Sequence, residues 1–147
     1  MCIRDRQCAV SEGCLHPRTP LDAKFSLPYG LACSLLYGKV DQSMFTPEKV
    51  QEPAIRALMQ RITVREDPEL TAAYPGHWSC RVKIRLQDGR ELEQFIQDPT
   101  GSYRKPLPQE ALLNKAEGLL EHVYPGRGRQ VAIKLLHLGE MERLPEI

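Results

Sequence analysis

The sequence lacks the short motifs that identify many enzyme and nucleotide-binding families. It has no glycine-rich phosphate loop, no G-x-G-x-x-G turn, no G-x-S-x-G turn and no H-E-x-x-H motif. No apolar run approaches the roughly 20 residues that a membrane span needs. The first residues are too polar for the apolar core of a signal peptide. No local motif therefore assigns a chemistry, and we expect no membrane partner.

An excess of charge of one sign is also missing. The 147 residues include 20 Lys and Arg and 19 Asp and Glu, which gives a formal net charge of +1. Surfaces that bind nucleic acid or anionic membranes need clustered basic residues in excess. We therefore expect no nucleic-acid partner. A hydrophobic fraction of 41% in a chain of this length is enough for the core of an ordinary globular domain.

Cysteine is present, but not in a pattern that builds a disulfide framework or a zinc site. The five cysteines are odd in number and irregular in spacing, and none forms a C-x-x-C pair. This usage predicts a reduced, cytoplasmic setting. Cys8, Cys14 and His16 lie near one another in sequence, but their spacing matches no standard zinc pattern, so we interpret them as unrelated residues.

The first thirteen residues show neither a helical nor a strand period. We interpret residues 1–13 as a disordered or artefactual lead and predict no regular structure from Met1 to Gly13. The opening "MCIRDR" looks like translated sequencing adapter rather than protein-coding sequence.

A helix is predicted directly after "DAKFS". Ser26 can cap it, Pro28 suits its first turn, Tyr37 ends it and Gly38 supplies a left-handed residue behind it. An apolar stripe is expected on one face of this helix, made of Leu27, Leu31 and Leu35, with Ala32 and Leu36 alongside.

Further elements follow up to the middle of the chain. Pro53 breaks the pattern that starts at Thr46, so we predict a short turn over Pro47–Gln51 and a helix from Pro53 to about Gln60. The inner face of that helix should carry Ile55, Leu58, Met59 and Ile62. "RITVRED" is interpreted as a strand and "PELTAAYPGHW" as a loop.

A β-hairpin is predicted from "SCRVKIRL" and "RELEQFIQ", and its register can be argued. A two-residue loop would place Ile84 opposite Glu93 and bury carboxylates. A three-residue loop that ends on Gly89 places Ile84 opposite Leu92 and Lys83 opposite Glu93. It also pairs Cys80 with Ile96 and Arg85 with Glu91, so both faces are satisfied and we predict this register.

Two helices should close the chain. The first runs from about Gln109 to His122, and its expected stripe is Leu112, Ala116, Leu119, Leu120 and Val123. The second starts in "QVAIKLLHL". The predicted fold class is therefore α+β, with a small antiparallel sheet, helices packed on it, and C-terminal helices.

Few side chains indicate chemistry on their own. Lys24, Ser26 and Tyr29 cluster at a helix entrance, where backbone N–H groups favour anions. In "GSYRKPL", Arg104 beside Lys105 has the chemistry to hold a carboxylate. A plain cap for Ser26, a packing role for Tyr29 and a solvated connector around Arg104 are the simpler alternatives. The carboxylates of Glu91 and Glu93 are better explained by cross-strand ion pairs than by acid–base catalysis.

Several segments, taken together and in order, resemble the C-terminal part of the MmgE/PrpD family. The resemblance rests on "PRTPLDAKFSLPYGLACSLLYGKV", "PAIRALMQRITVREDPEL", "VKIRLQDGRELE" and "RKPLPQEALLNKAEGLL", and it covers about Leu15 to Ile147. Family members are considerably longer, with an all-helical domain and a smaller α+β lid. The resemblance thus implies that residues 14–108 are part of the lid and that residues 109–147 return to the helical domain.

What the resemblance implies about function is a cofactor-independent lyase. Its substrate would be a small polycarboxylate such as 2-methylcitrate or cis-aconitate, with no metal or organic cofactor. The family's catalytic residues lie outside this chain, so none is assigned here. Lys24, Ser26, Tyr29 and Arg104 are the candidate substrate-binding residues. Pro108 stands where the family usually has a Ser that caps the next helix.

The implied partners are the polycarboxylate, a missing N-terminal helical domain of the same protein, and a second copy in a homodimer of the full-length form. This chain by itself is expected to be inactive. The alternative is a stand-alone α+β domain that is not an enzyme and binds a carboxylate or a partner protein.

Overall fold

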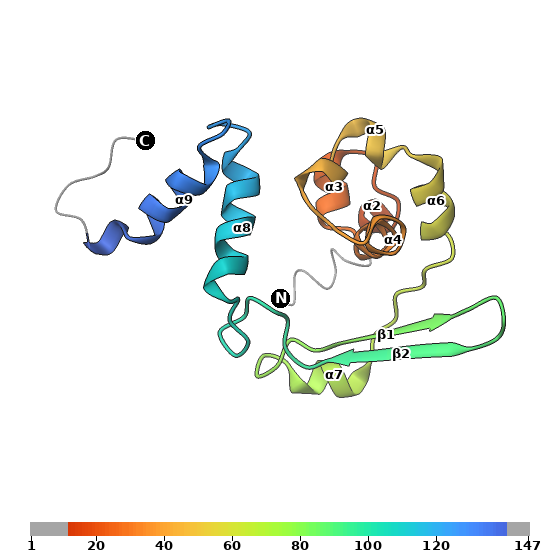
Figure 1. Ribbon diagram of the computed structural model, residues 1–147. Helices are drawn as coiled ribbons and strands as arrows, with labels where there is room; N and C mark the ends of the chain where they lie inside the picture. The colour runs from red at the N-terminus through yellow and green to blue at the C-terminus, as the bar shows by residue number, and fades with distance from the viewer. Residues whose placement is uncertain (1–11, 141–147) are drawn as a thin grey trace. The chain divides into compact units, whose positions relative to one another are not determined.

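The computed structural model describes residues 12–140, which belong to two compact units divided between Ala72 and Ala73. The described part of the first unit is helical, whereas the second contains the only sheet of the described chain and two further helices (Figure 1). The α+β class expected from the sequence is confirmed. The unit boundary differs from the expected division at residue 108, and the assignment of residues 14–108 to a lid stays a prediction.

The first unit is a succession of short helices. In order they are α2 (Glu12–Leu15), α3 (Pro20–Lys24), α4 (Leu27–Tyr37), the 3-10 turn η1 (Gln42–Met44), α5 (Pro47–Val50), α6 (Pro53–Met59) and α7 (Pro68–Ala73), the last of which crosses the boundary. Because Glu12 and Gly13 lie in α2, the predicted absence of structure is wrong for these two residues. The rest of that prediction, residues 1–11, lies outside the described residues.

The bounds of α4 follow from its capping residues, as predicted. The Ser26 hydroxyl accepts a hydrogen bond from the Tyr29 backbone N–H at 3.2 Å, and Pro28 occupies the first turn. At the other end Gly38 has a φ of 70°, a left-handed conformation that glycine adopts without strain.

The buried face of α4 is not the predicted leucine stripe. Tyr29, Ala32 and Cys33 are fully buried, whereas Leu27 and Leu35 are 49% and 48% exposed. Nearly every side chain of α4 is apolar, so periodicity alone does not distinguish one face from another. The small Ala32 and Cys33 allow a close approach of neighbouring elements, and α4 packs against α6. The leucines are left on the outer face.

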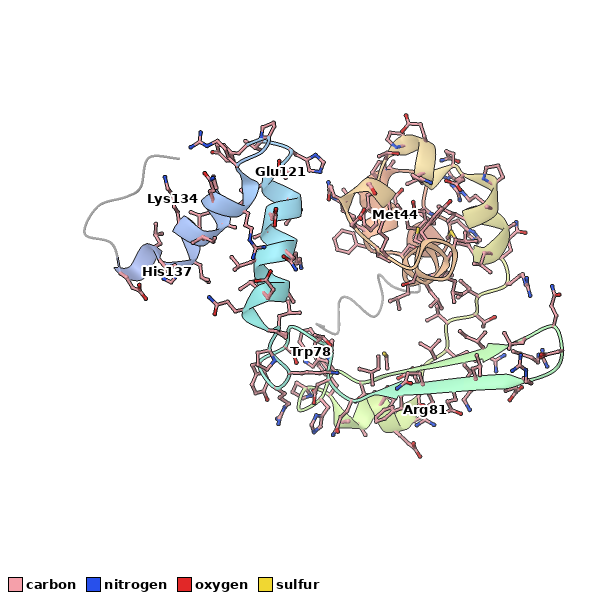
Figure 2. All side chains as sticks on the ribbon, in the orientation of Figure 1. Met44, Trp78, Arg81, Glu121, Lys134 and His137 are labelled. Atoms are coloured by element: carbon pink, nitrogen blue, oxygen red, sulfur yellow. The ribbon has the colours of Figure 1, made fainter. Side chains whose placement is uncertain are left out.

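One hydrophobic cluster forms the core of the first unit. Ile55 and Met59 of α6 are buried in it, and Leu58 and Ile62 pack against it, which confirms the predicted inner face. Met44 lies among the surrounding helices (Figure 2). The cluster as a whole consists of Ala23, Tyr29, Ala32, Cys33, Met44, Val50, Ile55 and Met59.

Two predictions for residues 61–78 are wrong. The segment "RITVRED" forms no strand, and the two strands of the sheet in the described chain pair only with each other. The expected loop after it begins with helix α7. Asp67 starts this helix: its carboxylate accepts from the Glu69 N–H at 3.1 Å, and its carbonyl accepts from the Thr71 N–H at 2.9 Å. The D-P-E sequence was the overlooked signal.

The hairpin of the second unit has the predicted register. Strands β1 (Cys80–Arg85) and β2 (Glu91–Ile96) are antiparallel, with Ile84 opposite Leu92 and Lys83 opposite Glu93 (Figure 1). Gly89 has a φ of 86°, as the left-handed loop position requires. Lys83 and Glu93 form an ion pair at 3.0 Å. The apolar face stays open, since Leu92 is 51% exposed.

Two helices complete the second unit, α8 (Gln109–Leu120) and α9 (Gly128–Leu136), followed by the 3-10 turn η2 (Leu138–Glu140). The predicted stripe of α8 is wrong, because Leu113 is the buried residue while Leu112 and Val123 are exposed. Arg129 of α9 bonds to Glu110 and Glu117 of α8 at 2.7 and 3.2 Å. No helix within residues 12–140 is long and apolar enough to cross a membrane.

The contact between α8 and α9 yields a stability prediction. A Cβ added at Gly128 would lie 2.9 Å from the Glu117 carbonyl oxygen and 3.0 Å from the Glu121 nitrogen, and both atoms belong to backbone. Gly128→Ala should therefore reduce the free energy of unfolding by about 1–3 kcal/mol, measured by urea denaturation.

Gly118→Ala is the matched control. Gly118 lies inside α8 with no atom within 4 Å of an added Cβ. The same substitution should there raise the free energy of unfolding by up to about 1 kcal/mol, because alanine is the better helix former. Equal changes in the free energy of unfolding at Gly118 and Gly128 would contradict the close approach of Gly128 to the backbone of α8.

Candidate functional site

The helix entrance that holds Lys24, Ser26 and Tyr29 is built by two consecutive caps. At the start of α3, the Thr19 hydroxyl accepts from the Asp22 N–H at 3.2 Å, and the Asp22 carboxylate accepts from the Thr19 N–H at 3.0 Å. The Arg18 N–H also donates to this carboxylate, and these hydrogen bonds lower the pKa of Asp22. Helix α3 then ends at Lys24, and Ser26 caps α4 directly afterwards.

Ser26 and Tyr29 have structural partners within this unit. Both residues are buried, and the Tyr29 hydroxyl donates a hydrogen bond to the Met44 carbonyl oxygen at 2.5 Å. Burial raises the pKa of Tyr29, so the phenol stays protonated. The packing role weighed for Tyr29 and the capping role weighed for Ser26 are therefore both present. Their contribution to substrate binding stays a prediction.

Lys24, by contrast, is exposed. Its Nζ lies 5.9 Å from the centroid of the Phe45 ring, a weak cation–π contact. Among residues 12–140 no carboxylate forms an ion pair with it. The Lys24 ammonium is thus available to an anion from outside this unit.

Arg104 belongs to the second unit, in a loop shaped by Gly101. Gly101 has a φ of 93°, and its N–H donates to the Lys105 carbonyl at 2.8 Å. The Arg104 guanidinium lies over the Tyr103 ring, 4.9 Å from its centroid, and the side chain is exposed. Such stacking leaves the in-plane N–H groups of arginine available for a carboxylate.

A polar pair that sequence reasoning missed lies at the open end of the hairpin. The His77 Nδ1 is 2.9 Å from a carboxylate oxygen of Asp98, and its Nε2 is 3.2 Å from the Gln97 amide nitrogen. Trp78, the next residue, marks this end of the hairpin in Figure 2. The signal was available: a register that pairs Cys80 with Ile96 brings the flanking residues together as well.

Other candidates from the sequence have ordinary explanations. Glu93 forms ion pairs with Lys83 at 3.0 Å and Arg81 at 3.6 Å, as expected of a cross-strand carboxylate. Between residues 12 and 140, no group of three or more His, Cys, Asp or Glu side chains is arranged to hold a metal ion. Cys8, part of the cysteine cluster weighed earlier, lies outside the described residues.

Comparison with known proteins places the chain in a family. Residues 5–138 match the model of the MmgE/PrpD C-terminal domain. The chain belongs to the MmgE/PrpD family. The match starts within the segment interpreted as a lead, and it confirms the resemblance inferred from the sequence.

Individual relatives of the MmgE/PrpD chain are lyases by name. It is 29% identical over 99 residues to the cis-aconitate decarboxylase of Mus musculus. This match covers 67% of this chain and 20% of the relative. It is 27% identical over 135 residues to the 2-methylcitrate dehydratase of Escherichia coli K12, and 29% identical over 133 residues to that of Cupriavidus necator. Each of the latter matches covers 86% of this chain and 28% of the relative. The chain thus spans between a fifth and just over a quarter of these relatives.

The buried phenol of Tyr29 leads to a second prediction. Tyr29→Phe removes the hydrogen bond to the buried Met44 carbonyl and should lower the free energy of unfolding by about 1–3 kcal/mol. Tyr37→Phe is the control, because the Tyr37 hydroxyl bonds to Glu52 at an exposed position. There the loss should stay near or below about 1 kcal/mol. A smaller effect at Tyr29 than at Tyr37, in chemical denaturation, would contradict the assigned burial.

Proposed function

We propose that this MmgE/PrpD chain is the C-terminal part of a cofactor-independent lyase that acts on a small polycarboxylate. The reaction would be dehydration or decarboxylation of a compound such as 2-methylcitrate or cis-aconitate. The observation that carries this proposal is the family match over residues 5–138, together with relatives named for these two reactions.

The chain itself would contribute positively charged side chains to substrate binding. Removing a proton beside a carboxylate develops negative charge on the substrate, and positioned cations stabilise that charge. Lys24 and Arg104 are exposed, and neither forms an ion pair with a carboxylate of residues 12–140. Ser26 and Tyr29 would support the first of these cations, because they hold the start of α4 directly behind Lys24.

The base that removes the proton is proposed to lie in another part of the full-length protein. A general base needs a lone pair that faces the substrate and a pKa near the working pH. Glu93 is held by Lys83 and Arg81, and Asp98 is held by His77. As a lid, the chain would bring its cations to a base on the other domain and exclude water when it closes.

The exposed apolar side chains support a covering partner for each unit. Leu27 and Leu35 of α4 are about half exposed, and so are Leu92 of the hairpin and Leu119 of α8. We propose that part of this surface packs against an N-terminal helical domain, since the matched family domain is a C-terminal one. The homodimer of the full-length form and the cytoplasmic location stay proposals from the resemblance and the cysteine usage.

A turnover assay tests the enzymatic proposal. The 147-residue chain should show no dehydration or decarboxylation of 2-methylcitrate, citrate or cis-aconitate, whereas a longer form that includes an N-terminal domain should turn one of them over. In the longer form, Arg104→Ala should raise KM by about tenfold with a smaller change in kcat, because it removes a charge-assisted bond to bound substrate. Measurable turnover by the 147-residue chain would contradict the assignment of the base.

The apolar surface leads to a separate prediction about association. The chain should bind a hydrophobic dye and self-associate in sedimentation experiments, because half-exposed leucines on both units offer apolar area to solvent. Leu27→Ser/Leu35→Ser should reduce both signals without unfolding the first unit, since neither side chain belongs to its core. A wild-type chain that is monomeric and does not bind the dye would refute the proposed covering partner.

A further inference from the structure

A surface depression lies beside the end of β2 in the second unit. It is lined by residues 94–98 together with Arg104 and Lys105, and its volume of about 350 Å³ suits a small molecule. It therefore brings two adjacent cations next to the strand end that carries Asp98.

The loop that presents the two cations is held by its own hydrogen bonds. The Ser102 N–H donates to the Pro99 carbonyl at 3.1 Å, and the Lys105 N–H donates to the Ser102 carbonyl at 3.1 Å. The Gly101 N–H closes the loop onto the Lys105 carbonyl at 2.8 Å. Because these bonds fix the backbone on both sides of Arg104, the loop is already shaped before a ligand binds.

Arg104 and Lys105 have no acidic partner within the described chain, in contrast to Lys83 and Arg129 of the same unit. Lys83 is paired with Glu93 at 3.0 Å, and Arg129 with Glu110 at 2.7 Å. Arg104 instead stacks on Tyr103, and this contact neutralises none of its charge. Two adjacent positive charges are thus left for an anion.

The acidic group that lines the depression is already engaged. Asp98 accepts from the Nδ1 of His77 at 2.9 Å, and its side chain is only 16% exposed. The Gln97 amide nitrogen lies 3.2 Å from the His77 Nε2, so both nitrogens of the ring have a polar partner. His77 therefore engages one oxygen of the carboxylate that lines the depression together with Arg104 and Lys105.

We propose that this depression is a carboxylate-binding subsite in which Arg104 and Lys105 bind the anion while His77 keeps Asp98 engaged. Arginine offers two parallel N–H donors to a carboxylate, and lysine adds a point charge beside it. The choice of a polycarboxylate as ligand rests on the proposed function. The cationic loop and the His77–Asp98 pair are features of the chain itself.

The first experiment measures citrate binding to the 147-residue chain by amide and arginine side-chain NMR shifts. Resonances of residues 94–105 should move and saturate, and Arg104→Ala/Lys105→Ala should weaken binding by about tenfold or more. Lys115→Ala, which removes an exposed cation of α8, should leave the affinity unchanged. Equal affinity of the wild type and the double variant would overturn the subsite.

The role of His77 has a signature that a merely structural role would not produce. His77→Ala should weaken citrate binding several-fold, because Asp98 then competes for the two cations, and His77→Ala/Asp98→Asn should restore it. If the His77→Ala variant does not fold, the single variant Asp98→Asn tests the role of His77. This variant should bind citrate at least as tightly as the wild type. Weaker binding by Asp98→Asn, or no restoration in the double variant, would overturn this role.

Inorganic phosphate separates a carboxylate subsite from a general anion site. Citrate should bind more tightly than phosphate at equal ionic strength, and the reverse order would overturn the carboxylate assignment. This comparison of citrate and phosphate affinity does not require the protein to turn over a substrate. Citrate binding at Arg104 and Lys105 without turnover by the longer protein would contradict the proposed function alone, and turnover without binding at these residues would contradict the subsite alone.

Discussion

The register of the β1–β2 hairpin is the constraint on which the polar chemistry of the second unit depends. Pairing Ile84 with Leu92 places Lys83 opposite Glu93 on the wet face. The same register brings the residues before β1 and after β2 together, so that His77 meets Asp98. A slip of one residue would reverse both faces and separate this pair. The loop that carries Arg104 follows directly, so its position also depends on the hairpin.

In the first unit the equivalent constraint is the close packing of α4. Small side chains at Ala32 and Cys33 allow the helix to approach the core, and the buried Tyr29 hydroxyl finds its acceptor at Met44. This arrangement turns the leucines of α4 outward. Because α4 buries Tyr29, Ala32 and Cys33 and leaves Leu27 and Leu35 about half exposed, it has a second apolar face that is suited to packing against another surface.

Each unit presents an exposed cation, and three acidic side chains of the second unit are paired. Lys24 and Arg104 are exposed, whereas Glu93, Asp98 and Glu110 are paired with neighbouring basic or histidine side chains. Such a distribution suits binding and charge stabilisation of an anionic substrate better than proton abstraction. It agrees with a chain that belongs to the MmgE/PrpD family and spans only part of the length of its lyase relatives.

The sequence by itself determined the local features: the caps of α4, the bounds of α6, the hairpin register, the α+β class and the family. The caps and helix bounds depend on residues that lie near one another in the chain. The hairpin register depends on the apolar and charged faces of the two strands, which only one register matches. Tertiary structure decided which face of α4 and α8 is buried, because both helices carry apolar residues on several sides. It also decided that "RITVRED" is not a strand, since a strand needs a partner whatever its own pattern. Among the candidate site residues, the capping role of Ser26 and the packing role of Tyr29 were foreseeable from the sequence, whereas the burial of both residues and the exposure of Lys24 and Arg104 came from the tertiary structure.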